Sequence, residues 1–296
     1  MTTKIKTRIL RSSKVPVNTK RRRLHIRWSR IITYACLTTG SILMIAPFMW
    51  MVLSGFKQPQ EIIVYPPVWF PANPTLTAFI RLWTEFEFKI YFINSIIVTS
   101  VVVVAVTISS AVIGFVLAKY QFPGRNLVFF LIIATMMIPW PTLLIPQYWI
   151  VLKLDWMNTY SALIVPLVFS AYGIFLVRQY MHAVPDELLD AGRIDGATEP
   201  IVFFRIVIPL SFPALAAVGI LHFLWTWDSF IWPLVVTNSK EMFTLPIGLQ
   251  LFAGQHSTDY VMLNAASSVS VIPILIIFIL LQRYFIEGIA MSGMKV

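Results

Sequence analysis

Cysteine and charged residues are both scarce in this chain. The one cysteine among 296 residues, Cys36, excludes a disulfide framework within the chain and a metal site built from cysteines. Charged residues make up 12% and hydrophobic residues 58%, against about 25% and about 45–50% in a typical soluble domain. The mean hydropathy of +0.78 agrees with these fractions. The composition argues against a soluble enzyme, a disordered protein and a coiled coil.

Motifs for ATP hydrolysis and other catalysis are also missing. No GxxxxGK[ST] phosphate-binding loop occurs, because the glycine-containing stretches 192–198 and 288–293 lack the Lys-Ser/Thr ending. Four acidic residues cluster in one segment, without a nucleophile or histidines at metal-binding spacing: Asp186, Glu187, Asp190 and Asp195. We therefore expect no enzyme, no catalytic residue and no metal site. If the protein moves a solute uphill, another chain must supply the energy.

The hydrophobic runs lack ionisable groups near their centres. A carrier coupled to an ion or proton gradient needs such groups in the membrane, where they are costly and mark function. His222 is the one candidate for a proton relay, and we expect it to be a neutral histidine hydrogen-bonded across helices. A secondary carrier or channel is therefore disfavoured, as is a membrane-embedded enzyme.

What the chain does have is a strongly basic beginning. Residues 1–30 hold eleven Lys and Arg and no acidic residue, whereas the remaining 266 residues hold twelve Lys and Arg against thirteen Asp and Glu. Arg21 to Arg23 could suggest a nucleic-acid-binding arm. A basic segment directly before a membrane helix is more typical of a topology signal held against anionic lipid, so we expect no nucleic-acid partner.

Six hydrophobic segments are long enough to cross a bilayer, which takes about 20 residues. They lie at about 31–53, 91–118, 127–150, 161–181, 206–227 and 264–284. The positive-inside rule and the even number of spans place both termini in the cytoplasm. This predicts an all-α integral membrane protein with a basic cytoplasmic tail (1–30), a first span (31–53), an extracytoplasmic loop (54–90), a five-helix core (91–286) and a cytoplasmic C-terminal tail (287–296). Five prolines within 59–76 argue against a regular helix in the extracytoplasmic loop.

The segment 185–213, PDELLDAGRIDGATEPIVFFRIVIPLSFP, is the one long polar, patterned stretch on the predicted cytoplasmic side. Pro185 followed by two acidic residues is a helix-start signal. Gly196 permits a tight break before a second helical run over 199–207 that leads into the fifth span. A helix, a glycine and a second helix would form a short rigid element projecting from the membrane.

This segment resembles the cytoplasmic motif EAA-xxx-G-xxxxxxxxx-I-x-LP of permease subunits from bacterial ABC importers. The spacing matches throughout, from Asp190-Ala191-Gly192 through Gly196 and Ile206 to Pro209. Asp190 replaces Glu, Gly192 replaces Ala and Ile208 replaces Leu. The Asp190 carboxylate keeps the charge of Glu on a side chain that is one methylene shorter.

The resemblance extends over about 50–296 and is to the carbohydrate-uptake branch, in particular to the smaller, six-span maltose permease subunit. Asp228 departs from the Asn that is common in the family at its position. The matching stretches are 94–95, 118–125, 137–139, 145–146, 193–197, 244–246, 248–250, 282–283, 288 and 293–295.

The resemblance implies a type I ABC importer permease fold and two sites for partner proteins. The coupling loop 185–209 would sit in a groove of an ATP-binding subunit, with Asp190 facing a basic residue there. The residues implied for coupling are Glu187, Asp190, Ala191, Gly192, Asp195, Gly196, Ala197, Ile206 and Pro209. The outer segment 247–262 would face a solute-binding protein, through Gly248, Leu249, Gln250, Gly254 and Gln255. The tail 287–296 resembles one that lies along the ATPase dimer.

The resemblance also implies the partners and the solute. The partners are a second, homologous permease subunit, two ATP-binding subunits and an extracytoplasmic solute-binding protein in the bacterial cytoplasmic membrane. ATP and Mg²⁺ would be bound by the ATP-binding subunits, and no cofactor by this chain. The implied solute is a sugar or oligosaccharide, with a glycerol-phosphate-type solute as the alternative. No substrate-binding residue is assigned, since in the maltose relative the sugar contacts lie mostly on the partner subunit.

Overall fold

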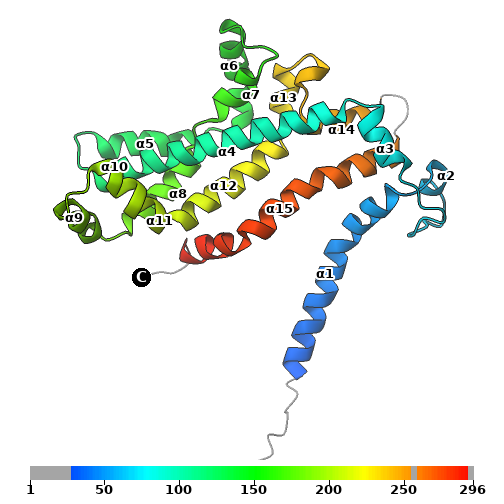
Figure 1. Ribbon diagram of the computed structural model, residues 1–296, viewed down its shortest axis with the longest axis horizontal. Helices are drawn as coiled ribbons and strands as arrows, with labels where there is room; N and C mark the ends of the chain where they lie inside the picture. The colour runs from blue at the N-terminus through cyan, green and yellow to red at the C-terminus, as the bar shows by residue number, and fades with distance from the viewer. Residues whose placement is uncertain (1–27, 255–258, 293–296) are drawn as a thin grey trace, which may run out of the picture. The chain divides into compact units, whose positions relative to one another are not determined.

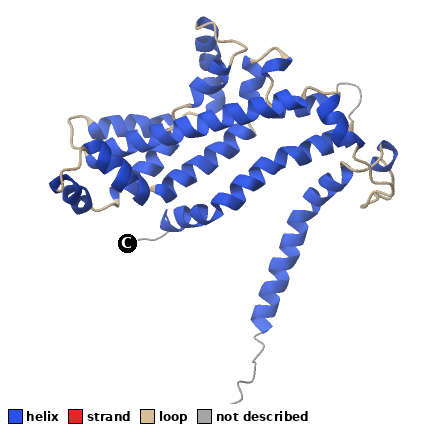
Figure 2. Cartoon of the chain, viewed as in Figure 1, coloured by secondary structure: helices blue, strands red, loops and turns tan. Residues whose placement is uncertain are grey.

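The computed structural model describes residues 28–254 and 259–292, and every regular element in these residues is a helix (Figure 2). The described residues hold three helices that are long and apolar enough to cross a membrane, within Arg30–Ser54, Phe88–Lys119 and Tyr260–Arg283. Three further candidates are pairs of bent helices, which bring the count to six if each pair is one span. The predicted all-α membrane fold is confirmed.

The first helix, α1 (Trp28–Ser54), contains the boundary between two compact units, residues 1–47 and 48–296. In the first unit, nearly every side chain from Arg30 to Pro47 is exposed, although most of these side chains are apolar. Apolar surface of this extent is stable only when another apolar phase covers it, as lipid does for a membrane helix.

In the second unit, α4 (Phe88–Lys119) is the central helix. Its 32 residues extend about 48 Å, and buried side chains occur along its whole length. It packs against α8 (Ala171–His182) and α12 (Phe212–Trp227), and α15 (Tyr260–Ser292) packs against α12 (Figure 1). The main core lies between α4, α8 and α12, and a second core joins α3 (Thr77–Thr84), α14 (Leu245–Phe252) and α15.

Small residues allow α4 and α8 to approach each other closely. A Cβ atom added to Gly114 of α4 would lie 2.9 Å from Cγ1 of Val177, and one added to Gly173 of α8 would lie 2.4 Å from Oγ of Ser110. Close backbone approach at small residues is a common way for helices to associate in membranes, where the hydrophobic effect contributes little.

Each of the third, fourth and fifth predicted spans is bent, and the expectation of single continuous helices there is wrong. The third consists of α5 (Arg125–Thr135) and α6 (Trp140–Lys153), which meet at 100°. The fourth is α7 (Tyr160–Ile164) with the 3₁₀ turn η1 (Val165–Leu167), bent by 40° against α8. The fifth bends by 74° between Leu210 and Phe212.

Proline and local capping explain these bends. Pro139 has an extended conformation (φ −58°, ψ 131°) and is followed by Trp140 and Pro141, so the third span cannot continue straight. Ser170 caps the N-terminus of α8, because its Oγ accepts a hydrogen bond from the Gly173 amide at 3.1 Å. In the fifth span, Pro209 and Pro213 flank the break and cannot donate backbone hydrogen bonds to the preceding turn.

Short helices occur in the predicted extracytoplasmic loop 54–90 and in the stretch 228–262, which includes the predicted outer segment 247–262. The stretch 59–76 holds a single helical turn, α2 (Pro59–Ile62), and is otherwise irregular up to Leu76. Residues 228–262 contain α13 (Ile231–Val236), the 3₁₀ turn η3 (Lys240–Met242) and α14. Asn94 fixes this region to α4 by donating to the carbonyls of Glu241 at 2.7 Å and Phe243 at 2.9 Å.

The close contact of α4 with α8 leads to a first prediction. Gly114→Ala should lower the free energy of unfolding by about 1–3 kcal/mol, because the new methyl group would also lie 3.1 Å from the backbone nitrogen of Arg178 and cannot be accommodated by side-chain movement alone. The matched control is Gly219→Ala in α12, where the nearest atom would be 3.7 Å away. Thermal unfolding in detergent measures the difference, and equal melting temperatures for the two variants would contradict the close contact.

Candidate functional site

The predicted helix–glycine–helix element is present and begins at the predicted residue. Helix α9 (Asp186–Ile194) follows Pro185, and α10 (Glu199–Val202) continues through the π-helical turn η2 (Phe203–Val207) to α11 (Ile208–Leu210). Gly196 has φ +86°, a conformation that residues with a side chain adopt only with strain. Its amide donates to the carbonyl of Arg193 at 3.0 Å, and that of Ala197 donates to Gly192 at 2.9 Å. These two bonds are the pattern that ends a helix at glycine.

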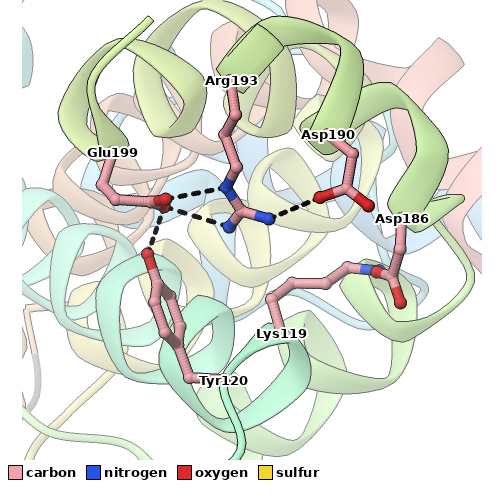
Figure 3. A network of polar contacts seen from close by, with 6 residues as sticks. All are labelled: Lys119, Tyr120, Asp186, Asp190, Arg193 and Glu199. Carbon is pink, nitrogen blue, oxygen red and sulfur yellow. Dashed lines mark hydrogen bonds and ion pairs between the residues drawn. The ribbon is translucent and has the colours of Figure 1, made fainter.

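Arg193 holds the two helices of this element together (Figure 3). Its Nη1 donates to Oδ1 of Asp190 at 2.8 Å, and its Nε donates to Oε1 of Glu199 at 2.8 Å. Nη2 donates to the other oxygen of Glu199 at 3.3 Å, which completes a two-point contact. These hydrogen bonds, that to Glu199 first, raise the pKa of Arg193. The guanidinium therefore joins α9 to α10 across the Gly196 turn.

The end of α4 anchors both helices. The Tyr120 hydroxyl donates to Glu199 of α10, and Nζ of Lys119 contacts Oδ1 of Asp186 in α9 at 2.7 Å (Figure 3). Lys119 also donates to the carbonyl of Val184, and its side chain is only 4% exposed. The hydrogen bond from Lys119 lowers the pKa of the Asp186 carboxyl. The element is thus attached to the central helix at two points, one on each side of the Gly196 turn.

Apolar packing seats the same element on the main core. Leu189 of α9 is buried, and Ala197 and Ile206 pack against the main core. A Cβ atom on Gly192 would lie 2.7 Å from Cδ1 of Ile206, so the glycine at this position gives Ile206 the space it occupies. The departure of Gly192 from the motif's Ala therefore fits the packing of this chain.

The outer face of the element presents apolar and acidic groups together. Ile194 is 86% exposed, the highest value for a large apolar side chain in α9, and Leu188 is also exposed. Glu187 and Asp195 are exposed and have no ion pair with the described residues. A mixed apolar and acidic surface on a rigid support is suited to a complementary cleft with basic groups.

The structure therefore divides the residues that the sequence singled out into two groups. Ala191 and Pro209 are exposed, as are Glu187, Asp195 and Gly196, whereas Gly192, Ala197 and Ile206 face inward. Asp190 was expected to face a basic residue of another subunit, and in this chain its carboxylate already bonds to Arg193. The roles of these residues toward a partner stay a prediction.

Sequence reasoning missed the residues that anchor the element: Lys119, Tyr120, Arg193 and Glu199. The signals were present, since Lys119 and Tyr120 follow directly on a long apolar run, and Arg193 and Glu199 are opposite charges six residues apart around a glycine. The sequence alone does not show which of these polar and charged side chains contact each other.

The residues predicted to face a solute-binding protein are partly buried. Gly248 of α14 is buried against Tyr91, because a Cβ atom there would lie 2.3 Å from Cδ2 of that ring, and Leu249 packs on the second core. Gln250 and Gly254 are exposed, and Gln255 lies outside the described residues. Of these residues, Gln250 and Gly254 are therefore the described ones that remain exposed to a partner.

Comparisons with known proteins agree with this architecture. The family described as "Binding-protein-dependent transport system inner membrane component" matches residues 110–290. A relative from Halalkalibacterium halodurans, the arabinooligosaccharides transport system permease protein AraQ, is 38% identical over 91% of this chain and 97% of its own.

Two solved structures have a similar fold. A bacterial ABC transporter involved in the import of the acidic polysaccharide alginate matches with a TM-score of 0.80 and 21% identity, over 88% of this chain and 97% of that one. A bacterial alginate ABC transporter in complex with an alginate pentasaccharide-bound periplasmic protein matches with a TM-score of 0.60 and 13% identity, over 91% and 99%.

The polar network leads to a second prediction. Arg193→Ala should increase amide hydrogen exchange across 186–202 about three- to tenfold, because it removes the contacts that join α9 to α10. Arg81→Ala is the matched control, since it removes the exposed Arg81–Glu85 ion pair of α3 and leaves the network intact. Unchanged exchange over 186–202 in the Arg193 variant would show that packing alone holds the element.

Proposed function

Because the chain belongs to the family of binding-protein-dependent transport system inner membrane components, we propose that it is one of two permease subunits of an ATP-driven importer for sugars or oligosaccharides. The other permease is homologous, and together the two form the path across the membrane. Two ATP-binding subunits bind and hydrolyse ATP with Mg²⁺, and this chain carries no cofactor. A solute-binding protein delivers the solute on the outer side.

The observation that carries this proposal is the attachment of the exposed helix–glycine–helix element to α4. Its outer face offers Ile194 beside acidic groups, and its inner face is joined to α4 by the contacts of Lys119 and Tyr120. A displacement of the element by a partner would therefore move the central helix. Because α4 packs along α8 and α12, a rigid-body rotation of the bundle is the expected response.

The orientation follows from charge. The eleven basic residues within 1–30 favour a cytoplasmic N-terminus, and six spans then place the C-terminus on the same side. The element 186–207 also lies on the cytoplasmic side in this arrangement, where the ATP-binding subunits are found. Anionic lipid would further hold the basic segment.

A sugar or oligosaccharide is the proposed solute class. The relative from Halalkalibacterium halodurans is an arabinooligosaccharide permease by name, and the similar solved structures belong to importers of a polysaccharide. The alternative solute class, which the sequence resemblance also allows, is a glycerol-phosphate-type solute.

A third prediction tests the coupling role through the backbone of the turn. Gly196→Val should reduce solute uptake at least tenfold in reconstituted transporter, while ATP hydrolysis continues, because a β-branched residue cannot adopt φ +86° without distorting the element. The matched control is Gly124→Val, which should reduce uptake less than Gly196→Val does. Gly124 also has a positive φ (+87°) and open space around it, but it lies outside the element. Wild-type uptake by the Gly196 variant would remove the role assigned to the turn.

A fourth prediction concerns charge. Asp190→Lys should lower the yield of the ATP-binding subunit in co-purification about fivefold or more, because it reverses the charge that faces the partner and removes one of the two carboxylates that Arg193 contacts. Glu85→Lys breaks an equally exposed ion pair on the outer side and should leave the yield unchanged. If both variants gave wild-type yields, Asp190 would have no part in the interface.

A further inference from the structure

A cavity lined by described residues lies near the middle of α4, far from the coupling element. Its volume is about 520 Å³, within the range of small-molecule sites. Val102 of α4 contributes to its wall, and 17 residues of helix, or about 25 Å, separate Val102 from Lys119. The cavity therefore lies at membrane depth.

Two helix breaks open into this cavity. Trp140, the first residue of α6, comes from the 100° bend, and Pro166, Phe169 and Ser170 come from the bend between η1 and α8. Irregular backbone at membrane depth is tolerated where it is buried in protein or lines a polar cavity, and broken helices in transporters commonly border their binding sites. Residues from both bends thus line the cavity.

The side chains combine aromatic faces with hydrogen-bonding groups. Trp232 lines the wall but is buried in the core, whereas Trp140 and Trp225 contribute accessible rings, and Trp225 is 54% exposed. Thr226 and Ser229 contribute hydroxyl groups from the end of α12 and the residues after it. Such rings accept the C–H faces of a sugar, while the polar groups bond to its hydroxyls.

Two of the polar side chains have hydrogen-bonding capacity left for a ligand. Gln147 lines the cavity, and its Oε1 is buried without a hydrogen-bond partner among the described residues. Buried polar atoms of this kind are costly in a membrane protein unless something pairs with them. Nδ1 of His222 lies 2.9 Å from the Val218 carbonyl of the same helix, so the expectation that this nitrogen bonds across helices is wrong. Because a carbonyl only accepts, Nδ1 must donate to it, and in the neutral ring Nε2 is an acceptor. Hydroxyl groups of a ligand can donate to both acceptors.

None of the described residues that line the cavity is charged. A phosphate or carboxylate ligand would lose its hydration without gaining a cation, whereas a neutral polyol would exchange water for the available acceptors. We infer that this cavity is a binding site for a neutral saccharide on this subunit's own half of the transport path. The inference rests on the proposed function for the direction of transport, and it adds a substrate site that the sequence resemblance placed on the partner subunit.

The first test is site protection in the complete transporter. In a Cys36→Ser background, Thr226→Cys places a thiol in the cavity, and Thr84→Cys places one on the exposed outer helix α3. An arabino-oligosaccharide should slow maleimide labelling at position 226 at least fivefold and leave position 84 unchanged, whereas glycerol 3-phosphate should protect neither. Protection at 226 by glycerol 3-phosphate alone, or by neither solute, would overturn the inference.

The second test measures uptake of the same saccharide by reconstituted transporter. Gln147→Leu should raise KM about five- to tenfold and Trp225→Ala at least tenfold, with Trp225→Phe close to wild type because it keeps an aromatic face. ATP hydrolysis stimulated by the loaded binding protein should persist in all three. KM values within twofold of wild type for both Gln147→Leu and Trp225→Ala would overturn the site.

The two proposals fail in different ways. If position 226 is not protected and the cavity variants have no effect, but Gly196→Val still uncouples uptake from ATP hydrolysis, the saccharide site is wrong and the importer function stands. If the wild-type complex moves no solute under ATP, the proposed function fails, and protection at position 226 still reports binding by itself.

Discussion

The attachment of a short polar element to the end of one long apolar helix is the contact on which the proposed coupling in this molecule depends. Lys119 and Tyr120 end α4 with two polar side chains, and each holds a different helix of the element. Individually, exposed ion pairs contribute little, typically below about 1 kcal/mol. Here Arg193 and Glu199 join the Tyr120 contact to Asp190 of α9, Lys119 holds Asp186 separately, and the buried Leu189 adds apolar packing. Several contacts together therefore attach the element to α4.

The second constraint is the cost of bending a helix inside a membrane. Proline at the breaks frees backbone groups that lipid cannot satisfy, so each break must be covered by protein or border a polar space. The break at 136–139 and the one before Ser170 both border the cavity, whereas the one at Ser211 lies in the helix that leads from the coupling element. One bend therefore shapes the segment that would move with a partner under the proposed function, and two shape the space that the proposed saccharide would occupy.

The departures from the family motif are consistent with the local packing. Gly192 leaves room for Ile206, which a larger residue would displace. Asp190, one methylene shorter than Glu, lies three residues before Arg193 on the same helix and bonds to it at 2.8 Å. We find no structural reason for Asp228 in place of the common Asn.

By itself, the sequence determined the features that depend on local composition. Hydropathy summed over about 20 residues located the spans, Pro185 with two acidic residues located the start of α9, and Gly196 located the turn, because these signals act within a few residues. Only the tertiary structure decided where the spans bend and which polar groups contact each other. A hydropathy sum is the same for a straight and a bent span, so the 100° bend at 136–139 was not visible. The contacts of Lys119 with Asp186 and of Tyr120 with Glu199 join residues distant in sequence, which only the packing of the chain brings together. The same packing leaves Oε1 of Gln147 buried without a hydrogen-bond partner among the described residues.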